Sequence, residues 1–300
     1  MRVNPNLIPD MLSSISASEV ELDKAEQEVA TGKSVNQPSD DPAAAADMVQ
    51  NTIETGEIDQ YTQNVTDVLS TVQTADSALA SVVSSLTQAI SLGTEGANGT
   101  NNSSDQQALA EQVQGLLTSV VSQANLTYQG AYVFGGTDTT TTPYTADSSS
   151  STGYTYNGNS NTNSVVIGAS LSIQTNLPGS QIFSNSTTNV IGALSGLVTA
   201  LQSGDSSSIE TATSAVTTAL NYVGQQRVFY GNVESQLDNQ ETSLQTDTVN
   251  LASQANNLVG VDEATAAENL SEAESANSAA LAAAAKVLPN TILNYLSPPS

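Results

Sequence analysis

Apolar residues recur every seventh position near both ends of the chain, and this spacing predicts amphipathic helices. Over residues 7–29 one track is formed by Ile8, Ile15, Leu22 and Val29, with Met11, Ser18 and Ala25 at the intervening positions. A repeat of seven places these side chains on one face, as in the seam of a coiled coil. Gly32 suits a left-handed helix cap, so we expect this first helix to end there.

Residues 34–42 are expected to form an extended loop, because the residues that precede Pro38 and Pro42 disfavour helix. Asp40 or Asp41 can accept the free backbone N–H groups of a new helix whose first residue is Pro42. The paired carboxylates could instead bind a divalent cation or act in acid–base chemistry. Capping is preferred, since hard cations require several convergent oxygen ligands and none is evident nearby.

Two long helices carry the most regular repeats in the chain. The helix after Pro42 is expected to run to about Leu92. Its apolar positions are Val65, Val72, Leu79 and Leu86 on one track, and Tyr61, Val68, Ala75, Val82 and Ala89 on the other. The second long helix spans 209–258, with the track Val223, Tyr230, Leu237, Leu244, Leu251 and Leu258. The seam of the first of these helices predicts an intramolecular core. In the second helix the partner positions Gln226, Gln240 and Gln254 are polar, which indicates a seam shared with neighbours or with water.

Three shorter helices complete the helical part. After the Gly-rich turn at 93–102, Ser104 and Gln107 could form a capping box for a helix that buries Leu109, Val113, Leu116 and Val120. Residues 189–202 predict another helix. Asp262 can cap a final helix, and Pro289 is expected to bend or end it. The face of that final helix is formed by Leu270, Ala273, Ala280, Ala284 and Val287.

The middle of the chain changes its period. Residues 128–136, 154–156 and 165–173 predict short strands, and the low-complexity residues 137–163 predict surface loops. The fold class is therefore mainly α with a small β insertion (α+β), built as an elongated antiparallel helical bundle or coiled coil from both termini. We expect a terminal coiled-coil assembly region at 1–40 plus 259–300, a helical bundle core at 41–136 plus 187–258, and a β-rich outer insertion at 137–186.

Composition removes several function classes. The chain has 30 Asp and Glu against 5 Lys and Arg, a formal net charge of −25, and neither His nor Cys. Nucleic acid and anionic membranes would repel such a surface. Without His and Cys there is no His-based triad and no thiolate or imidazole metal site. We expect no catalytic residues, no cofactor and no metal. The first residues also lack the apolar region of a signal peptide, and no segment is apolar enough to span a membrane.

The terminal helices are expected to order fully only when they find partners. A short isolated helix is marginal in water, and an alanine-rich face buries little area. Packing against each other and against other subunits would supply the missing contacts. The predicted subunit-interaction residues are Ile8, Met11, Ile15, Leu22, Val29, Leu270, Ala273, Ala280, Ala284, Val287, Leu288 and Leu296.

Three parts of the sequence carry a resemblance to a known family. Residues 29–42, with Pro38, Ser39, Asp40, Asp41 and Pro42 as their most discriminating part, closely resemble the N-terminal signature of the flagellar hook-associated protein 3 family. Residues 124–137 are similar to that family's Gly-x-Tyr-x-Phe-x-Gly-Thr stretch, and residues 261–262, 270–271 and 286–296 are similar to its C-terminal pattern. The resemblance implies a structural junction protein of the bacterial flagellum, related to flagellin and joining the hook to the filament.

The resemblance also implies where such a protein is found and what it contacts. It would be extracellular, exported by the flagellar type III apparatus without a cleaved signal peptide. Its expected partners are further copies of itself in a ring, the other hook-associated protein on the hook side, flagellin on the filament side, and an export chaperone. Two alternatives stay open: a flagellin that forms the filament itself, and a secreted surface adhesin that binds a ligand through the β module at 137–186.

Overall fold

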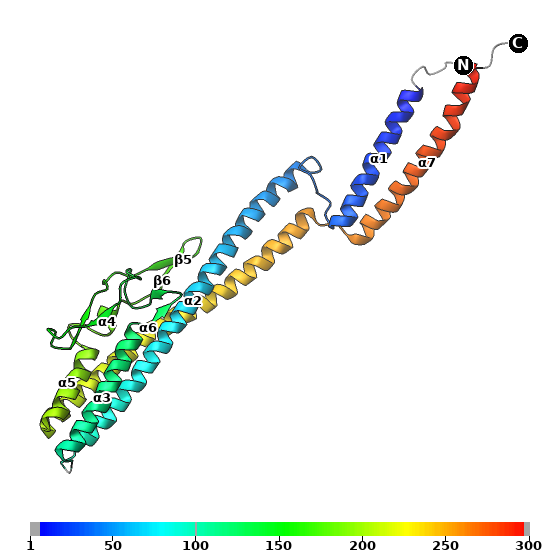
Figure 1. Cartoon of the computed structure of the whole chain (residues 1–300). Coiled ribbons are helices and arrows are strands. Elements are labelled where there is room, and N and C mark those ends of the chain that lie inside the picture. Colours follow the sequence, from blue (N-terminus) through cyan, green and yellow to red (C-terminus); the bar gives the residue numbers. More distant parts are fainter. Residues whose placement is uncertain (1–6, 100, 297–300) are drawn as a thin grey trace. The chain divides into compact units, whose positions relative to one another are not determined.

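The computed structural model describes the backbone of residues 7–99 and 101–296, and the side chains of 8–99 and 101–286. This part of the chain is mainly helical, with short antiparallel hairpins between the helices (Figure 1). It divides into two compact units, one made of 1–57 and 246–300 and the other of 58–245. The fold class predicted from the sequence is confirmed, whereas the predicted domain limits at 40 and 258 stay a prediction.

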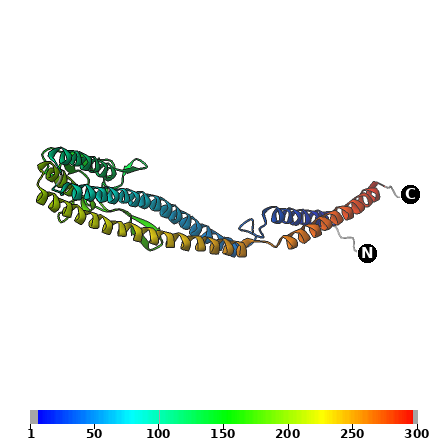
Figure 2. The same ribbon diagram turned by 90° about the horizontal axis from the view of Figure 1, so that it is seen from below.

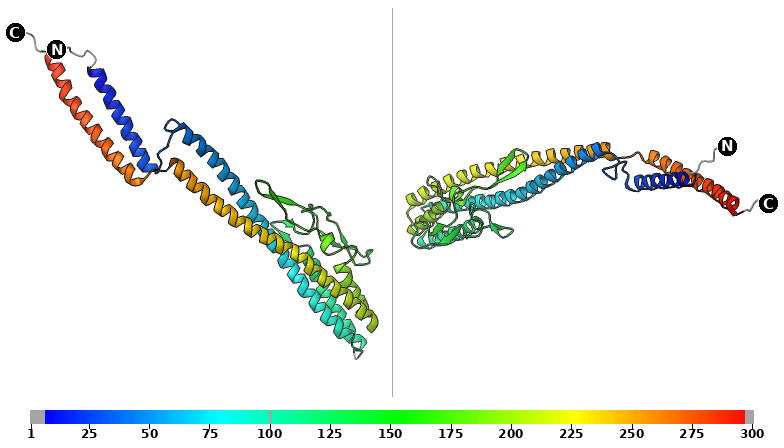
Figure 3. Two further views of the ribbon diagram at one scale, coloured as in Figure 1. Left: turned by 180° about the vertical axis from the view of Figure 1, so that it is seen from behind. Right: turned by 90° about the horizontal axis from the view of Figure 1, so that it is seen from above.

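The first unit is a pair of terminal helices together with the adjoining turns of the two long helices. Helix α1 (Leu7–Thr31) and helix α7 (Glu263–Leu296) pack against each other, and they lie side by side in Figures 1 and 3. The left-handed glycine expected at the end of α1 is present, with a φ of 67° at Gly32. The Oδ1 atom of Asp262 accepts the backbone N–H groups of Ala264 and Thr265, so the predicted cap of α7 is also confirmed.

The two long helices begin and end close to where the sequence places them. They are α2 (Pro42–Gly96) and α6 (Ser206–Val259), and each contributes residues to both units. In the second unit they run alongside each other (Figure 2). The predicted tracks form the core there, with Val65, Val72, Leu79 and Leu86 on α2 and Val223, Tyr230, Leu237 and Leu244 on α6 all buried. The intramolecular interpretation of the α2 seam is confirmed, and the apolar track of α6 up to Leu244 is buried in the same core.

Helix α3 (Ser103–Ala124) packs on helix α5 (Val190–Ser203) in the same unit. The capping box predicted for α3 is wrong in its residues. Asn102 caps the helix and Asp105 completes the box, because the side chain of Asn102 accepts the N–H groups of Ser104 and Asp105. One inward position also differs, since Leu117 is 2% exposed and Leu116 is only half-buried. At the other end of the chain, α7 continues past Pro289 to Leu296.

Three antiparallel hairpins and one short helix lie between α3 and α5. The hairpins pair β1 (Thr127–Tyr128) with β2 (Ala131–Tyr132), β3 (Tyr144–Ala146) with β4 (Tyr154–Tyr156), and β5 (Ser164–Gly168) with β6 (Leu171–Gln174), and helix α4 spans Gly179–Ile182. Strand β3 was not predicted from the sequence. Its Tyr144 is buried and donates its hydroxyl hydrogen bond to the carbonyl of Gly179, 2.8 Å away.

An aromatic cluster joins this β module to the core formed by the helices. The rings of Phe134 and Phe183 meet edge to face with centroids 5.3 Å apart, and the ring of Tyr144 packs on Phe183 at 6.0 Å. Next to it, Gly136 has a φ of 79° and its carbonyl accepts the buried amide of Asn176 at 2.9 Å. The glycine pair at 135–136 therefore forms a turn.

Candidate assembly surfaces

The residues that follow α1 and those that precede α7 are joined by a short antiparallel bridge between Lys33 and Gly260. The backbone N–H of Ser34 donates to the carbonyl of Val259 at 2.7 Å, and the N–H of Val261 donates to the carbonyl of Gly32 at 3.1 Å. Such backbone bonds satisfy groups that the helix ends leave free. They fix the point at which α1 ends and α7 is about to begin.

The loop at 38–42, singled out from the sequence, caps the start of α2. The Oδ1 atom of Asp41 accepts the N–H groups of Ala43 at 2.9 Å and Ala44 at 3.1 Å. Pro42 occupies the first helical position, where its missing N–H costs nothing. The capping interpretation of the acidic pair is confirmed for Asp41.

Asp40 has a different task from its neighbour. Its Oδ2 atom accepts the N–H groups of Asn36 at 3.0 Å and Gln37 at 2.9 Å, so it closes the turn inside the loop. These two donors, Gln37 first, lower the pKa of the Asp40 carboxyl below its ordinary value, because they favour the charged form. In the described part of the chain, no group of three or more acidic side chains is arranged to hold a metal ion.

An apolar groove lies beside this loop within the first unit. It has a volume of about 330 Å³, and its lining includes Val35, Pro38, Met48, Val49, Ile53 and Val259. Val49 and Ile53 point outward from α2 and are 61% and 52% exposed. The opposite side of the same helix turns inward, where the side-chain amide of Asn51 donates to the carbonyl of Leu251 at 3.0 Å.

The groove was not predicted from the sequence, although the sequence contains a signal for it. Ala45, Met48, Val49 and Ile53 follow the spacing i, i+3, i+4 and i+8 of a helical stripe. The stripe is easily overlooked because it is short and precedes the longer seam that begins at Tyr61. The first turns of α2 thus carry apolar side chains on an exposed face as well as on the buried one.

The predicted interaction residues of α1 divide into two groups. Met11, Ile15 and Leu22 are half-buried, whereas Ile8 and Val29 are 42% and 45% exposed. Further exposed apolar side chains on this helix are Leu12 and Val20, at 64% and 62%. Packing against α7 therefore covers only part of the apolar surface of α1.

The facing residues of α7 are small and are also incompletely covered. Leu270, Ala273 and Ala280 are half-buried, and Ala284 is buried. The side chains of Val287, Leu288 and Leu296 lie outside the described residues. Whether all these residues contact another subunit stays a prediction.

Two polar atoms lie inside this helix pair without a hydrogen-bond partner. They are the hydroxyl oxygen of Ser18 on α1 and the amide oxygen of Asn277 on α7. A buried polar atom without a partner lowers stability, since water no longer solvates it. The α1–α7 pair is therefore weaker than a fully apolar seam of the same length would be.

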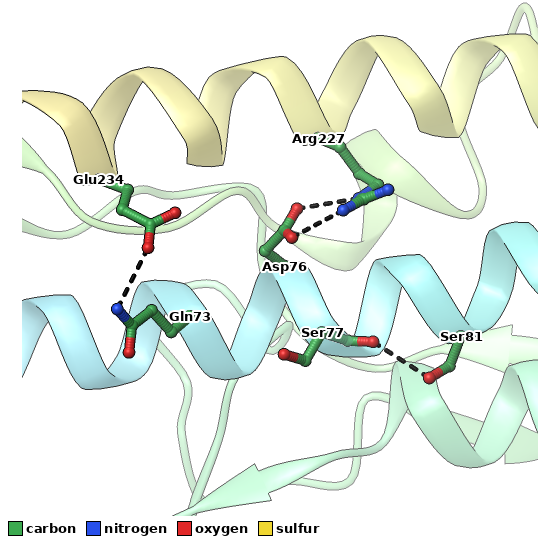
Figure 4. Close-up of polar contacts among 6 residues, drawn as sticks. All are labelled: Gln73, Asp76, Ser77, Ser81, Arg227 and Glu234. Carbon is green, nitrogen blue, oxygen red and sulfur yellow. Dashed lines mark hydrogen bonds and ion pairs between the residues drawn. The ribbon is translucent and has the colours of Figure 1, made fainter.

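A polar clamp between α2 and α6 stands out in the second unit (Figure 4). Arg227 donates from Nε to one carboxylate oxygen of Asp76 at 2.9 Å and from Nη2 to the other at 2.7 Å. Nearby, the amide of Gln73 donates to Glu234 at 3.1 Å. The carboxylate raises the already high pKa of Arg227. Two-pronged contacts of this kind fix the relative register of two helices.

The structure also bears on membrane insertion. Within the described residues, no helix is both long enough and apolar enough to cross a bilayer.

Comparison with known proteins places this arrangement in a class. Residues 6–139 match the bacterial flagellin N-terminal helical region, and residues 213–296 match the bacterial flagellin C-terminal helical region. The two matched ranges together take in more than two thirds of the chain. The chain is therefore similar to the flagellins in both of its helical ends.

The curated relatives that the chain matches are both flagellar hook-associated protein 3. Flagellar hook-associated protein 3 of Escherichia coli (strain K12) is 29% identical over 181 residues, which cover 60% of this chain and 56% of that relative. The chain thus aligns with less than two thirds of the length of the curated relatives that it matches. The predicted resemblance to the flagellar hook-associated protein 3 family is confirmed.

Solved structures show the same fold. A putative flagellar hook-associated protein from Vibrio parahaemolyticus has a TM-score of 0.68 at 20% identity, covering 74% of this chain and 100% of that one. The flagellar junction protein FlgL from Legionella pneumophila has a TM-score of 0.60 at 14% identity, covering 72% of this chain and 100% of that one. At these identities the likeness speaks for the fold alone.

Proposed function

We propose that this chain is a structural protein of the bacterial flagellum that joins the hook to the filament through subunit packing. The observation that carries the proposal is the similarity to flagellar hook-associated protein 3, together with the family match at both helical ends. The activity is mechanical, so the proposal assigns no catalytic residue and no cofactor.

The partners follow from a position between two assemblies. Copies of the chain would form a ring, with the other hook-associated protein on the hook side and flagellin on the filament side. An export chaperone would keep the chain from assembling before it reaches its extracellular site. The exposed apolar side chains on α1 support packing against other subunits, because a soluble monomer gains nothing from displaying them.

The apolar groove supports the same proposal, and we assign it to a neighbouring copy of this chain. Val49 and Ile53 form an exposed apolar stripe on α2. The 30 acidic residues of the chain would not pack against such an apolar surface. In a ring, head-to-tail contacts place one face of each copy against a different face of the next. One copy would thus cover the groove of another.

The absence of cysteine makes this arrangement testable. A single Ile53→Cys substitution carrying a photoactivatable crosslinker should yield, in assembled flagella, a product with the mass of two chains. The matched control is Thr211→Cys, an exposed position on α6 far along the sequence from the groove. A product that contains flagellin or another protein in place of a second copy would overturn the assignment of the groove.

A flagellin remains the second candidate function, because the family matches are to flagellin regions. The curated similarity favours the junction protein over it. Cells that lack this chain should build hooks without attached filaments and release flagellin into the medium. Loss of flagellin itself from the medium would instead support the flagellin alternative.

A further inference from the structure

The sequence contains two Asn-Gly pairs, and the structure places them in different surroundings. Asn98–Gly99 lies in the turn between α2 and α3, and Asn157–Gly158 follows strand β4. In such a pair the backbone nitrogen of the glycine can attack the side-chain amide carbon of the asparagine. Glycine permits the required backbone conformations because it has no side chain. The reaction therefore depends on how firmly each pair is held.

Asn98 and Gly99 are both exposed, and of this pair only the backbone of Asn98 is hydrogen-bonded to another described residue. The backbone N–H of Asn98 donates to Glu95 at 3.1 Å, and its carbonyl accepts from Asn101 at 3.2 Å. In the described part of the chain, the side-chain amide of Asn98 makes no hydrogen bond, and no atom lies within 4 Å of the position of a β-carbon on Gly99. The side chain of Asn98 is thus free to rotate toward the backbone nitrogen of Gly99.

Asn157 and Gly158 are restrained on both sides. The side-chain amide of Asn157 donates to Thr145 Oγ1 at 2.8 Å, and its backbone N–H donates to the Pro143 carbonyl at 2.8 Å. A β-carbon on Gly158 would lie 2.7 Å from the carbonyl oxygen of Gly135. Attack at this pair would first have to break the side-chain hydrogen bond and move a packed backbone.

We propose that Asn98 is a site of spontaneous deamidation. The Gly99 nitrogen forms a bond to the Asn98 Cγ atom and loses its proton, and the side-chain amide nitrogen takes up a proton and leaves as ammonia. Water then opens the resulting five-membered imide at either carbonyl. The product is aspartate or isoaspartate, and no oxidant, reductant or enzyme takes part.

The new carboxylate would affect the end of α2 near Gly96. The C-terminus of a helix carries partial negative charge, so a negative group there is unfavourable. An isoaspartate would also lengthen the main chain of the turn by one carbon. We therefore expect the turn between α2 and α3 to be less well ordered in protein that has deamidated on storage. This expectation does not rest on the proposed function.

Peptide mapping of the purified full-length chain after incubation at mildly alkaline pH tests the proposal. The peptide with Asn98 should gain one mass unit and split into aspartate and isoaspartate forms on the order of tenfold faster than the peptide with Asn157, because only the latter must first lose a hydrogen bond. A Gly99→Ala variant should slow the reaction at Asn98 and leave Asn157 unchanged. Equal rates at the two sites, or faster reaction at Asn157, would overturn the proposal.

Discussion

At the residue scale, the start of α2 depends on a single side chain. Asp41 accepts two backbone N–H groups that would otherwise lack partners. Asp41→Ala should lower the free energy of unfolding by about 1 kcal/mol, the usual effect of losing an N-cap. Urea denaturation followed by circular dichroism measures it. The matched control is Asp47→Ala, an exposed acidic residue within the same helix, which should show no such loss.

Asp40 gives the neighbouring loop a dependence on pH. Its pKa is lowered by the N–H groups of Gln37 and Asn36, so its stabilising effect is fully present above the ordinary value of about 3.9 and is lost as the pH falls through the lowered pKa. The amide resonances of Gln37 and Asn36, followed by NMR during acidification, should therefore shift with a midpoint below 3.9. In Asp40→Asn this transition should disappear. A midpoint at or above the ordinary value would contradict the assignment.

We expect the clamp between Asp76 and Arg227 to fix the register of α2 relative to α6 and to contribute little to the free energy of unfolding. The two side chains are 29% and 35% exposed, so solvent screens their attraction. A double-mutant cycle with Asp76→Asn and Arg227→Gln should give a coupling energy on the order of 0.2–1 kcal/mol that decreases with added salt. A coupling of several kcal/mol, insensitive to salt, would contradict this account.

At the element scale, the α1–α7 pair contains a removable defect. Asn277→Leu eliminates the amide oxygen that has no hydrogen-bond partner and adds apolar surface to the seam. The variant should protect the amides of α7 from hydrogen exchange about fivefold or more, since an unsatisfied buried polar group costs about 1–3 kcal/mol. Ser278→Leu, at the exposed position beside it, should leave the exchange rates nearly unchanged. Equal protection in both variants would show that the unpaired amide oxygen of Asn277 does not lower the stability of the α1–α7 pair.

Elements with strong repeats could be predicted from the sequence, and isolated contacts could not. The tracks of Val65 to Leu86 and Val223 to Leu244 identify their own buried faces, because a repeat of seven can be satisfied by one seam only. The Asp41 cap was predictable for a different reason. A proline and an acidic residue at the start of a helix act on the backbone next to them, so no distant partner is needed.

Other features depend on partners that are distant in sequence. Ile8 and Val29 belong to the predicted track of α1, yet they are exposed although α1 packs against α7. Strand β3 owes its existence to pairing with β4 and to the packing of Tyr144, neither of which leaves an alternating pattern in the sequence. The contact of Asp76 with Arg227 joins residues 151 positions apart, which no local spacing indicates.

At the scale of the whole molecule, folding and assembly depend on different parts of the chain. The larger part of the buried apolar core lies within 58–245, whereas the unit with the terminal helices contributes few buried side chains. Removing residues 1–29, or 262–300, should therefore leave the remaining helices folded and abolish assembly. Circular dichroism checks the folding, and electron microscopy of flagella checks the assembly. A truncated chain that still assembles would contradict the assignment of the terminal helices.

The central claim is that this chain acts at the boundary between hook and filament, and its position on intact cells tests that claim most directly. Ser149 is exposed in the loop between β3 and β4, and in a chain without cysteine a Ser149→Cys substitution provides a single site for a fluorescent label. We predict one spot at the base of each filament. Label along the whole filament would identify a flagellin, label over the cell body would favour a surface adhesin, and either result would contradict the junction function.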